Sequence, residues 1–420
     1  MPRRAEPVAA HPMAAVDAQF YWMSAKMPND QFLLYAFDGR PAEPECAIDQ
    51  LVRRARACPE LRMRVHDGAV LTYPRWLATD VGSEQVVRHN LDDDSWHGCL
   101  AAVVGLAREQ LDIRLMSWRA HVFAPVSGIP GVQAPGTVVV VQVAHALGDG
   151  VRASALAARL FGRRAPIPSA EPRRRGFLPR VAADAVCTHR RLVRDTEAGL
   201  LAPGAGSRPL RSTNARPEGA RELRTLVRHR SQICGPTVTV AVLAAVSAAL
   251  SRLPDGNAEQ LGAEVPMAKP GLRQANNHFG NIVVGLYPQL ERGERMHRIA
   301  ADLANARRRM QHPAASASDL AFARVPAALL RWGVSQFDAD MRPDQVAGNT
   351  VVSSVHRGAA DLSFGEAPVV LTAGYPALSP VMGLTHGVHG IGDTIAVSVH
   401  AAQSAVADID SYLELLDQAL

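Results

Sequence analysis

The chain has 420 residues, of which 47% are hydrophobic and 20% are charged. A chain of this length and composition buries substantial cores and is predicted to fold as two domains, which excludes disorder over most of its length. The formal charge is +5, and arginine carries almost all of the positive charge. The basic residues are not interleaved with aromatic ones. We therefore expect no nucleic acid as a partner, although phosphates or acidic head groups fit this charge.

The cysteines and the apolar runs indicate the cellular compartment in which the protein is expected. The five cysteines are odd in number and none has metal-ligand spacing, which predicts reduced, mostly structural thiols in a cytoplasmic protein. The first residues, MPRRAEPVAAHPM, lack the apolar stretch of a signal peptide, and no run reaches the ~18 apolar residues of a membrane span. Membrane contact is therefore expected to be peripheral only.

Strands and helices alternate along the first half of the chain. Asp17 is expected to cap a short helix that contains Phe20, and a strand follows over residues 31–39. The further predicted elements are a helix and turn from residue 45, a strand over 61–65, a strand pair near 71–76, a helix over 100–111 and a strand over 118–123.

The first half closes on residues 138–150, VVVVQVAHALGDG. The valine run predicts a strand buried on both faces, and helical spacing after Gly150 predicts a helix. His145 is the first titratable group after the strand, and Asp149 follows behind a glycine. A partly desolvated imidazole accepts a proton near neutral pH, and the carboxylate would orient the ring or brace the turn. The alternative is a structural histidine at a strand end, with Asp149 capping the helix.

Residues 163–220 differ in character from what precedes them. Prolines alternate with Arg173, Arg174 and Arg175, and a basic helical patch with Arg190, Arg191 and Arg194 comes before a Gly/Pro/Ser stretch. We predict a linker with one helix, its arginines forming a solvated face. Contact with acidic lipid or phosphate is the alternative.

The second half restarts the alternation. The predicted elements are a strand over 223–227, an apolar helix over 238–253, a loop over 265–273, a strand over 282–287, a basic helix over 294–310, strands over 350–355, 369–371 and 394–400, and a closing helix over 409–420. Both halves mix predicted strands and helices in the same way and have similar length, which fits two related folds side by side.

Several stretches, in this order, resemble bacterial wax ester synthase/diacylglycerol acyltransferases. His145 to Gly150 resembles the HHxxxDG motif of the wider CoA-dependent acyltransferase superfamily. The others are VDAQF at 16–20, LDIRLMSW at 111–118, NHFGN at 277–281, and residues 394–410. Each motif is short, but together they cover about residues 13–420.

This resemblance implies an α/β fold of two chloramphenicol-acetyltransferase-like sandwich domains, with a tunnel at their interface. It implies that acyl-CoA and an alcohol enter from opposite sides, that His145 is the general base, and that Asp149 braces the loop. Gly150 would permit close backbone approach, and Asn277 and Asn281 would contact substrate. No metal and no cofactor are expected, since acyl-CoA is a substrate.

The sequence departs from the family pattern in three places. The first motif histidine is Ala144. The family's Asn-Asp near the start of the second-half apolar helix is replaced by Thr239 and Val240. The family's tNVPGP segment is matched by residues 353–358, SSVHRG. These departures bear on the choice of acyl acceptor and on activity itself.

Other polar residues are further candidates for the site. Asn277 and Asn281 would alternatively cap a turn before a strand. Arg273 is expected to be a solvated loop arginine, with pairing to Asp149 or contact with a CoA phosphate as alternatives. His386, His389 and His400 lack carboxylate or cysteine partners at ligand spacing, so no metal site is expected there. His356 and Arg357 follow a strand, with a position facing the tunnel as the less favoured alternative, and Ser154 lacks a nucleophile elbow.

We therefore predict three segments and one function. Residues 1–165 form the domain with the HxxxDG motif, 166–220 the Pro/Arg-rich linker, and 221–420 the second domain. The predicted function is transfer of a fatty acyl group from acyl-CoA to a long-chain alcohol or diacylglycerol, at an anionic membrane or lipid-droplet surface. The alternatives are a condensation-type enzyme using a carrier-protein thioester or another hydroxyl acceptor, and a catalytically silent lipid-binding relative.

Overall fold

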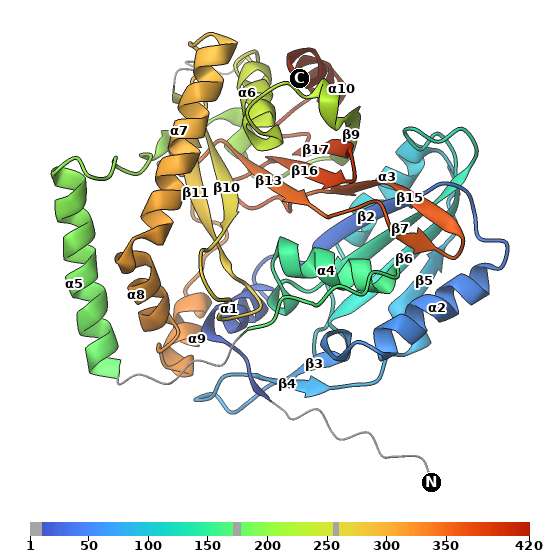
Figure 1. Cartoon of the computed structure of the whole chain (residues 1–420), viewed down its shortest axis with the longest axis horizontal. Helices are drawn as coiled ribbons and strands as arrows, with labels where there is room; N and C mark the ends of the chain where they lie inside the picture. Colours follow the sequence, from blue (N-terminus) through green and yellow to red (C-terminus); the bar gives the residue numbers. More distant parts are fainter. Residues whose placement is uncertain (1–10, 171–177, 255–259) are drawn as a thin grey trace.

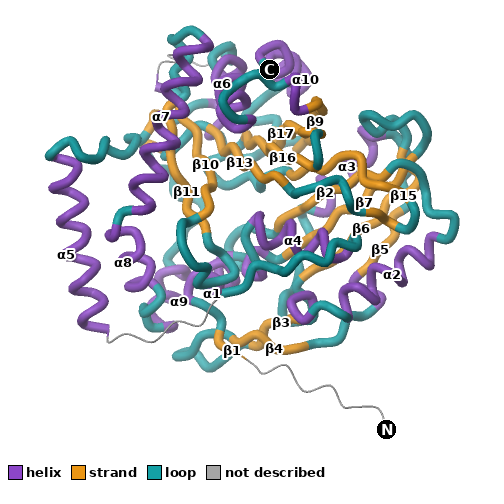
Figure 2. Tube along the Cα trace, in the orientation of Figure 1, coloured by secondary structure: helices purple, strands orange, loops and turns teal. Residues whose placement is uncertain are grey.

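The computed structural model describes residues 11–170, 178–254 and 260–420. Two six-stranded mixed sheets form the centre of the molecule, with helices packed around them (Figure 1). Figure 2 shows the strands of the two sheets next to each other, with most helices toward the outside and one helix near the middle of the view.

The first sheet has the order β14-β15-β2-β7-β6-β5. Its central strand is β7, and every residue of that strand is buried, which confirms the valine run as a strand covered on both faces. β7 pairs antiparallel with β2 and β6, so the loop after β6 is a hairpin connection. The strands are β2 (Gln31–Phe37), β5 (Val86–His89), β6 (Trp118–Val126), β7 (Gly136–Val143), β14 (Ser363–Phe364) and β15 (Ala367–Gly374).

Two strands of this first sheet come from the second half of the sequence. β15 pairs antiparallel with β2, and β14 pairs with β15. The boundaries at residues 165 and 220 stay predictions, but the two halves exchange backbone hydrogen bonds across them.

The second sheet has the order β11-β10-β13-β16-β17-β9. β13 lies parallel to both neighbours, whereas the other pairs are antiparallel. The loop predicted over 265–273 is wrong in its first part, because β10 occupies it, and β16 was not predicted. The strands are β9 (Arg221–His229), β10 (Gly262–Ala268), β11 (Phe279–Gly285), β13 (Thr350–His356), β16 (Leu384–Ile391) and β17 (Thr394–Ala402).

Short strands complete the β structure. β3 pairs with β4, which also pairs with β1, and β8 pairs with β12. Their bounds are β1 (His11–Pro12), β3 (Met63–His66), β4 (Arg75–Ala78), β8 (Arg208–Pro209) and β12 (Gln345–Val346).

The helices cover the sheet faces and close three apolar clusters. One cluster lies under α2 and α4, a second includes α3, and the third packs α6 and α10 on the second sheet. The helices are α1 (Ala15–Met23), α2 (Pro44–Arg56), α3 (Trp96–Leu106), α4 (Gly150–Leu160), α5 (Leu178–Glu197), α6 (Val238–Leu250), α7 (Arg292–Gln311), α8 (Pro313–Phe322), α9 (Ala327–Ser335) and α10 (Ile409–Ala419). α8 and α9 were not predicted.

The predicted basic helix of the middle segment is α5, which lies beside α8 at the edge of the molecule (Figure 1). Arg190, Arg191 and Arg194 are exposed, as expected for a solvated face. Arg173, Arg174 and Arg175 lie outside the described residues. Among the described helices, none is long and apolar enough to cross a membrane. Cys46, Cys187 and Cys234 are exposed, so the expectation of mostly structural thiols holds only for the buried Cys58 and Cys99.

Candidate active site

The HxxxDG motif occupies the turn between the central strand β7 and helix α4. β7 ends at Val143, a 3-10 turn spans His145–Leu147, and α4 begins at Gly150. Asp149 is the N-cap of α4, and its carboxylate accepts a hydrogen bond of 3.0 Å from the Arg152 N–H. The sequence pattern therefore predicted the local structure, and it places the His145 ring at the end of the sheet.

His145 is held by Asn277 and not by Asp149. The imidazole Nδ1 lies 3.0 Å from Asn277 Oδ1. Asn277 Nδ2 donates to the His145 carbonyl at 2.8 Å and to Asp17 Oδ1 at 2.9 Å. Because both amide hydrogens are used, Oδ1 must face the ring and accept from a protonated Nδ1. The neutral imidazole then carries its free lone pair on Nε2, the atom that a general base needs.

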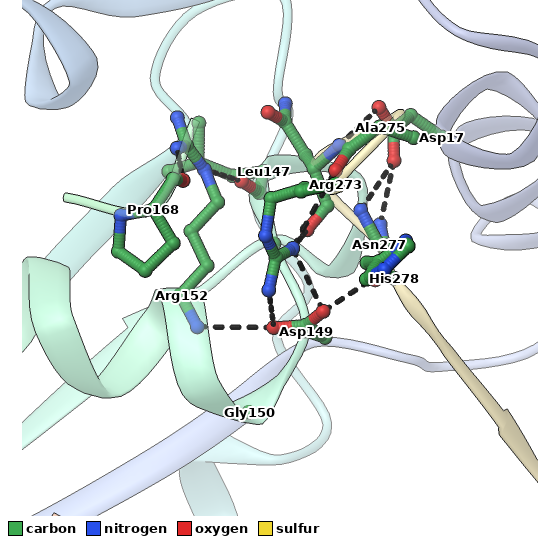
Figure 3. Close-up of polar contacts among 12 residues, drawn as sticks. Asp17, Leu147, Asp149, Gly150, Arg152, Pro168, Arg273, Ala275, Asn277 and His278 are labelled. Carbon is green, nitrogen blue, oxygen red and sulfur yellow. Dashed lines mark hydrogen bonds and ion pairs between the residues drawn. The ribbon is translucent and has the colours of Figure 1, made fainter. Parts of the chain in front are cut away.

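Asp17 fixes the direction of that amide. Its carboxylate accepts from the backbone N–H groups of Asn276 and Asn277, each at 2.9 Å, in addition to Asn277 Nδ2. Burial raises the pKa of Asp17 to about 6, although these hydrogen bonds oppose the rise. The expectation that Asp17 caps its helix is wrong, because α1 begins two residues earlier and its N-cap is Ala14. Figure 3 shows Asp17 reaching the segment around Asn277 from a different part of the chain.

Aromatic rings enclose the imidazole. The Phe20 ring stacks on His145 with centroids 4.0 Å apart and planes 5° apart, and Phe279 lies 5.9 Å away. This apolar setting disfavours the charged ring, so burial lowers the pKa of His145 below its ordinary value, while the Asn277 hydrogen bond partly opposes the shift. The ring is therefore neutral and basic at pH 7.

Asp149 braces the turn through a buried ion pair. Arg273 Nη1 lies 2.8 Å from Asp149 Oδ2, and the His278 N–H donates to the same oxygen at 2.8 Å (Figure 3). Burial alone would raise the pKa of Asp149, but Arg273 and the two backbone donors outweigh it and hold the pKa below its ordinary value. The expectation of a solvated Arg273 is wrong, since this guanidinium pairs with the motif carboxylate.

A cavity of about 440 Å³ opens beside the motif and takes its lining from both sheets. His145, Asp149 and Gly150 line it from the first half, and Phe279 and Val355 from the second. A Cβ on Gly150 would lie 3.3 Å from the Val355 side chain, so glycine permits the close approach of α4 to β13. Of the two predicted asparagines, Asn277 contacts His145, whereas Asn281 is exposed on β11 and is not part of the lining.

Two of the departures from the family pattern contact each other. Thr239 Oγ1 lies 2.8 Å from Ser354 Oγ, which joins the start of α6 to β13. Ala144, at the place of the first motif histidine, is buried. Of the three departures, the segment over 353–358 therefore supplies part of the cavity wall, namely Ser353, Ser354, His356 and Arg357.

The three C-terminal histidines do not form a cluster. His386 lies between Thr350 and Tyr412, His400 contacts the Pro376 carbonyl, and His389 lines the cavity. No group of three metal-ligating side chains gathers anywhere in the part of the chain that the structure describes. Nothing in the sequence marked His389 as a cavity residue, because it lies on the unpredicted β16.

Comparisons with known proteins agree with this architecture. Residues 275–420 match the model of the WS/DGAT C-terminal domain. No curated protein matches the chain by sequence. The wax ester synthase/diacylglycerol acyltransferase from Marinobacter aquaeolei VT8 superposes with a TM-score of 0.63 at 19% identity, covering 97% of this chain and 98% of that one.

Condensation domains share the fold as well. The starter condensation domain of rhizomide synthetase, in complex with C8-CoA, gives a TM-score of 0.60 at 14% identity, over 98% of this chain and 94% of that one. The condensation domain of Monacolin K polyketide synthase gives 0.53 at 15% identity, over 99% and 98%. The expected fold of two acetyltransferase-like α/β domains is thereby confirmed. Residues 275–420 thus match the WS/DGAT C-terminal domain, and the chain as a whole shares the fold of the wax ester synthase/diacylglycerol acyltransferase from Marinobacter.

Proposed function

We propose that this protein is an O-acyltransferase that moves an acyl group from acyl-CoA to the hydroxyl of a lipophilic acceptor. The observation that carries the proposal is the His145 ring, which lines the cavity while its Nδ1 is engaged by Asn277. The match of residues 275–420 to the WS/DGAT C-terminal domain supports acyl transfer, and the C8-CoA complex of the condensation domain of similar fold supports a CoA thioester as donor.

The geometry supports a single-base mechanism. His145 Nε2 accepts the proton of the acceptor hydroxyl as the oxygen attacks the thioester carbonyl carbon. The resulting tetrahedral intermediate collapses with cleavage of the C–S bond, and the imidazolium returns its proton to the departing thiolate. The products are an ester and free CoA, and the histidine ends in its starting state.

The surrounding residues position this base and do not relay its proton. Asn277 and Asp17 keep the proton on Nδ1, so Nε2 stays free for the acceptor. Asp149 is engaged by Arg273 and by backbone donors, and the role it fits is bracing of the turn. Holding donor and acceptor together in one cavity would supply much of the remaining rate.

We propose a long-chain alcohol or a diacylglycerol as acceptor, and a lipid surface as the place where it is met. Support for the surface comes from α9, where Leu329 is 53% and Trp332 is 61% exposed. Large exposed apolar side chains of this kind favour contact with a membrane or a lipid droplet. The exposed arginines of α5 are suited to anionic head groups. Cytoplasmic location remains part of this proposal.

The test is release of free thiol from a panel of acyl-CoAs, from acetyl to palmitoyl, against a panel of alcohols and diacylglycerol. We expect release that requires both substrates and yields the corresponding ester. Release only from a carrier-protein thioester would favour the condensation-type alternative. Ligand binding without turnover of any pair would contradict the proposal and favour a silent relative.

A further inference from the structure

Arg357 carries an unpaired positive charge into the cavity wall. It follows β13 directly, is 5% exposed, and lines the cavity that holds His145. Its Nη1 donates to the Leu34 and Ala373 carbonyls and to Thr372 Oγ1, whereas its buried Nε has no partner. Among the described residues, no carboxylate forms an ion pair with it.

His389 adds a second unsatisfied group at the same wall. It is 5% exposed, also lines the cavity, and its buried Nδ1 has no hydrogen-bond partner. Gly374 lies between the two side chains, since a Cβ there would fall 2.7 Å from His389 Cε1 and 3.0 Å from Arg357 Nη2. Glycine is therefore required for the imidazole and the guanidinium to approach each other.

The other groups near Arg357 do not neutralise its charge. The Tyr35 ring lies 5.2 Å from Arg357 Cζ and offers its π face, which is a weak partner for a buried cation. Arg163 donates to the Arg357 carbonyl, and its own carboxylate partner is Asp361, 2.5 Å away. Buried charges in proteins are normally paired, so an uncompensated cation at a cavity wall indicates an anionic ligand.

Arg357 stands where this sequence departs from the family pattern that it resembles. Arg357 and the neighbouring His356 replace the Pro-Gly of the segment matched by residues 353–358. Two residues before Arg357, Val355 packs against the motif residue Gly150. At about 3.3 Å per extended residue, the cation therefore lies close enough for one substrate to span it and His145.

From this arrangement we propose that Arg357, assisted by His389, binds a carboxylate of the substrate, so that the enzyme favours an acidic partner over a neutral lipid. The inference rests on the proposed acyl transfer and narrows its substrate class. A carboxylate fits because a guanidinium offers parallel N–H donors to its two oxygens, and the imidazole adds a further donor. The acid belongs either to the acceptor, as a hydroxy acid, or to the acyl chain, as the half-thioester of a dicarboxylic acid.

The test compares matched acidic and neutral substrates by thiol release. The acceptor arm uses an ω-hydroxy fatty acid and its methyl ester with one acyl-CoA. The donor arm uses succinyl-CoA and butyryl-CoA with one alcohol. In the wild type we expect the acid to be favoured about tenfold or more in kcat/KM in one arm, which identifies the source of the carboxylate.

Variants assign the preference to the arginine. Arg357→Gln should reduce the acid-to-neutral ratio to about one, whereas Arg357→Lys should retain part of it because the charge remains. Arg88→Gln, which removes an exposed arginine paired with Glu45, should leave the ratio unchanged. If Arg357→Gln fails to fold, the acid-to-neutral ratios of the wild type and of Arg357→Lys still test whether the enzyme prefers the acid.

A binding measurement separates this inference from the proposed catalysis. Calorimetric titration of each acid and its neutral partner into the His145→Ala protein should show tighter binding of the acid, whether or not turnover is found. A wild-type ratio near one in both arms, with equal binding of acid and neutral compounds, would overturn the inference. An equal rise in KM for all CoA thioesters in Arg357→Gln would also overturn it, since that result indicates a CoA phosphate.

Discussion

The amide of Asn277 determines which nitrogen of His145 is basic. The ring stacks on Phe20, so its plane is fixed, and its Nδ1 faces Asn277 Oδ1. Asp17, in turn, holds the amide nitrogen of Asn277 through a hydrogen bond of 2.9 Å. A residue far away in the sequence thereby controls the tautomer of the proposed base.

Asp17→Asn tests this control. An asparagine has one accepting oxygen in place of two, so its NH₂ group would face a backbone N–H of this segment and the hold on Asn277 should loosen. The Nδ1 tautomer of His145 would then be less well fixed, and we expect kcat/KM to fall by roughly 10²-fold or more. Asp49→Asn, at an exposed position of α2, should leave the rate unchanged. Full activity in a folded Asp17→Asn protein would contradict the tautomer assignment.

The pH dependence of the rate follows from the same surroundings. Burial lowers the pKa of His145, so the neutral base persists to below pH 6.5 and is lost only as the pH falls further. Asp17 gains its proton at about pH 6, which weakens its hold on Asn277 over the same range. A pH profile of kcat/KM should be flat near pH 7 and fall on the acid side, with its midpoint below 6.5. A midpoint above 7 would mean that another group limits the rate.

At the scale of elements, Asp149 joins the start of α4 to the segment before β11. Its side chain is 6% exposed, and Arg273 and the His278 N–H reach it from the second half of the chain. Removing one partner of a buried ion pair leaves the other uncompensated. The motif aspartate therefore fits a stabilising role that also fixes the cavity wall.

Asp149→Asn should lower the free energy of unfolding by about 3 kcal/mol at pH 7. The pKa of Asp149 is held below its ordinary value, so its stabilisation is present above pH ~4 and is lost as the pH falls through the lower folded value. Denaturant unfolding of both proteins at several pH values measures this difference. Asp408→Asn, the same exchange at the exposed N-cap of α10, should cost much less, because asparagine also caps helices and no buried cation loses its partner. Unaltered stability with a lost rate would give Asp149 a chemical role.

Local sequence signals identified some elements and missed others for physical reasons. β7 was predictable from its valines and α6 from its apolar residues, because the composition of each segment by itself indicates a buried element. β16 contains two glycines and two histidines, and it is a strand because β13 and β17 flank it. Motifs also gave His145 and Asp149, whereas the pairing of Arg273 with Asp149 depends on a contact that no local pattern encodes.

At the scale of the whole molecule, the cavity exists only where the two halves meet. β15 crosses to the first sheet and covers the edge of β2, and β13 packs against α4. The candidate base comes from the first half and the residue that orients it from the second. The alternation of predicted strands and helices, and the similar length of the two halves, predicted two related α/β units. They did not predict that β14 and β15 of the second half join the first sheet.

A fragment of residues 1–220 tests how far the halves depend on each other. Without β15, the long strand β2 would present an unpaired edge, which favours association between chains. We expect the fragment to aggregate or to unfold without cooperativity, as measured by size-exclusion chromatography and thermal denaturation. A monomeric fragment with a cooperative transition would show that the first half is an independent domain.

The central claim is that one imidazole removes the proton of the acceptor hydroxyl. It is tested most directly by thiol release from acyl-CoA in His145→Ala, with the exposed His97→Ala as the matched control. We predict that His145→Ala loses at least about 10²-fold in rate while it still folds and unfolds cooperatively, and that His97→Ala keeps the wild-type rate. A folded His145→Ala protein that releases thiol at the wild-type rate would contradict the account.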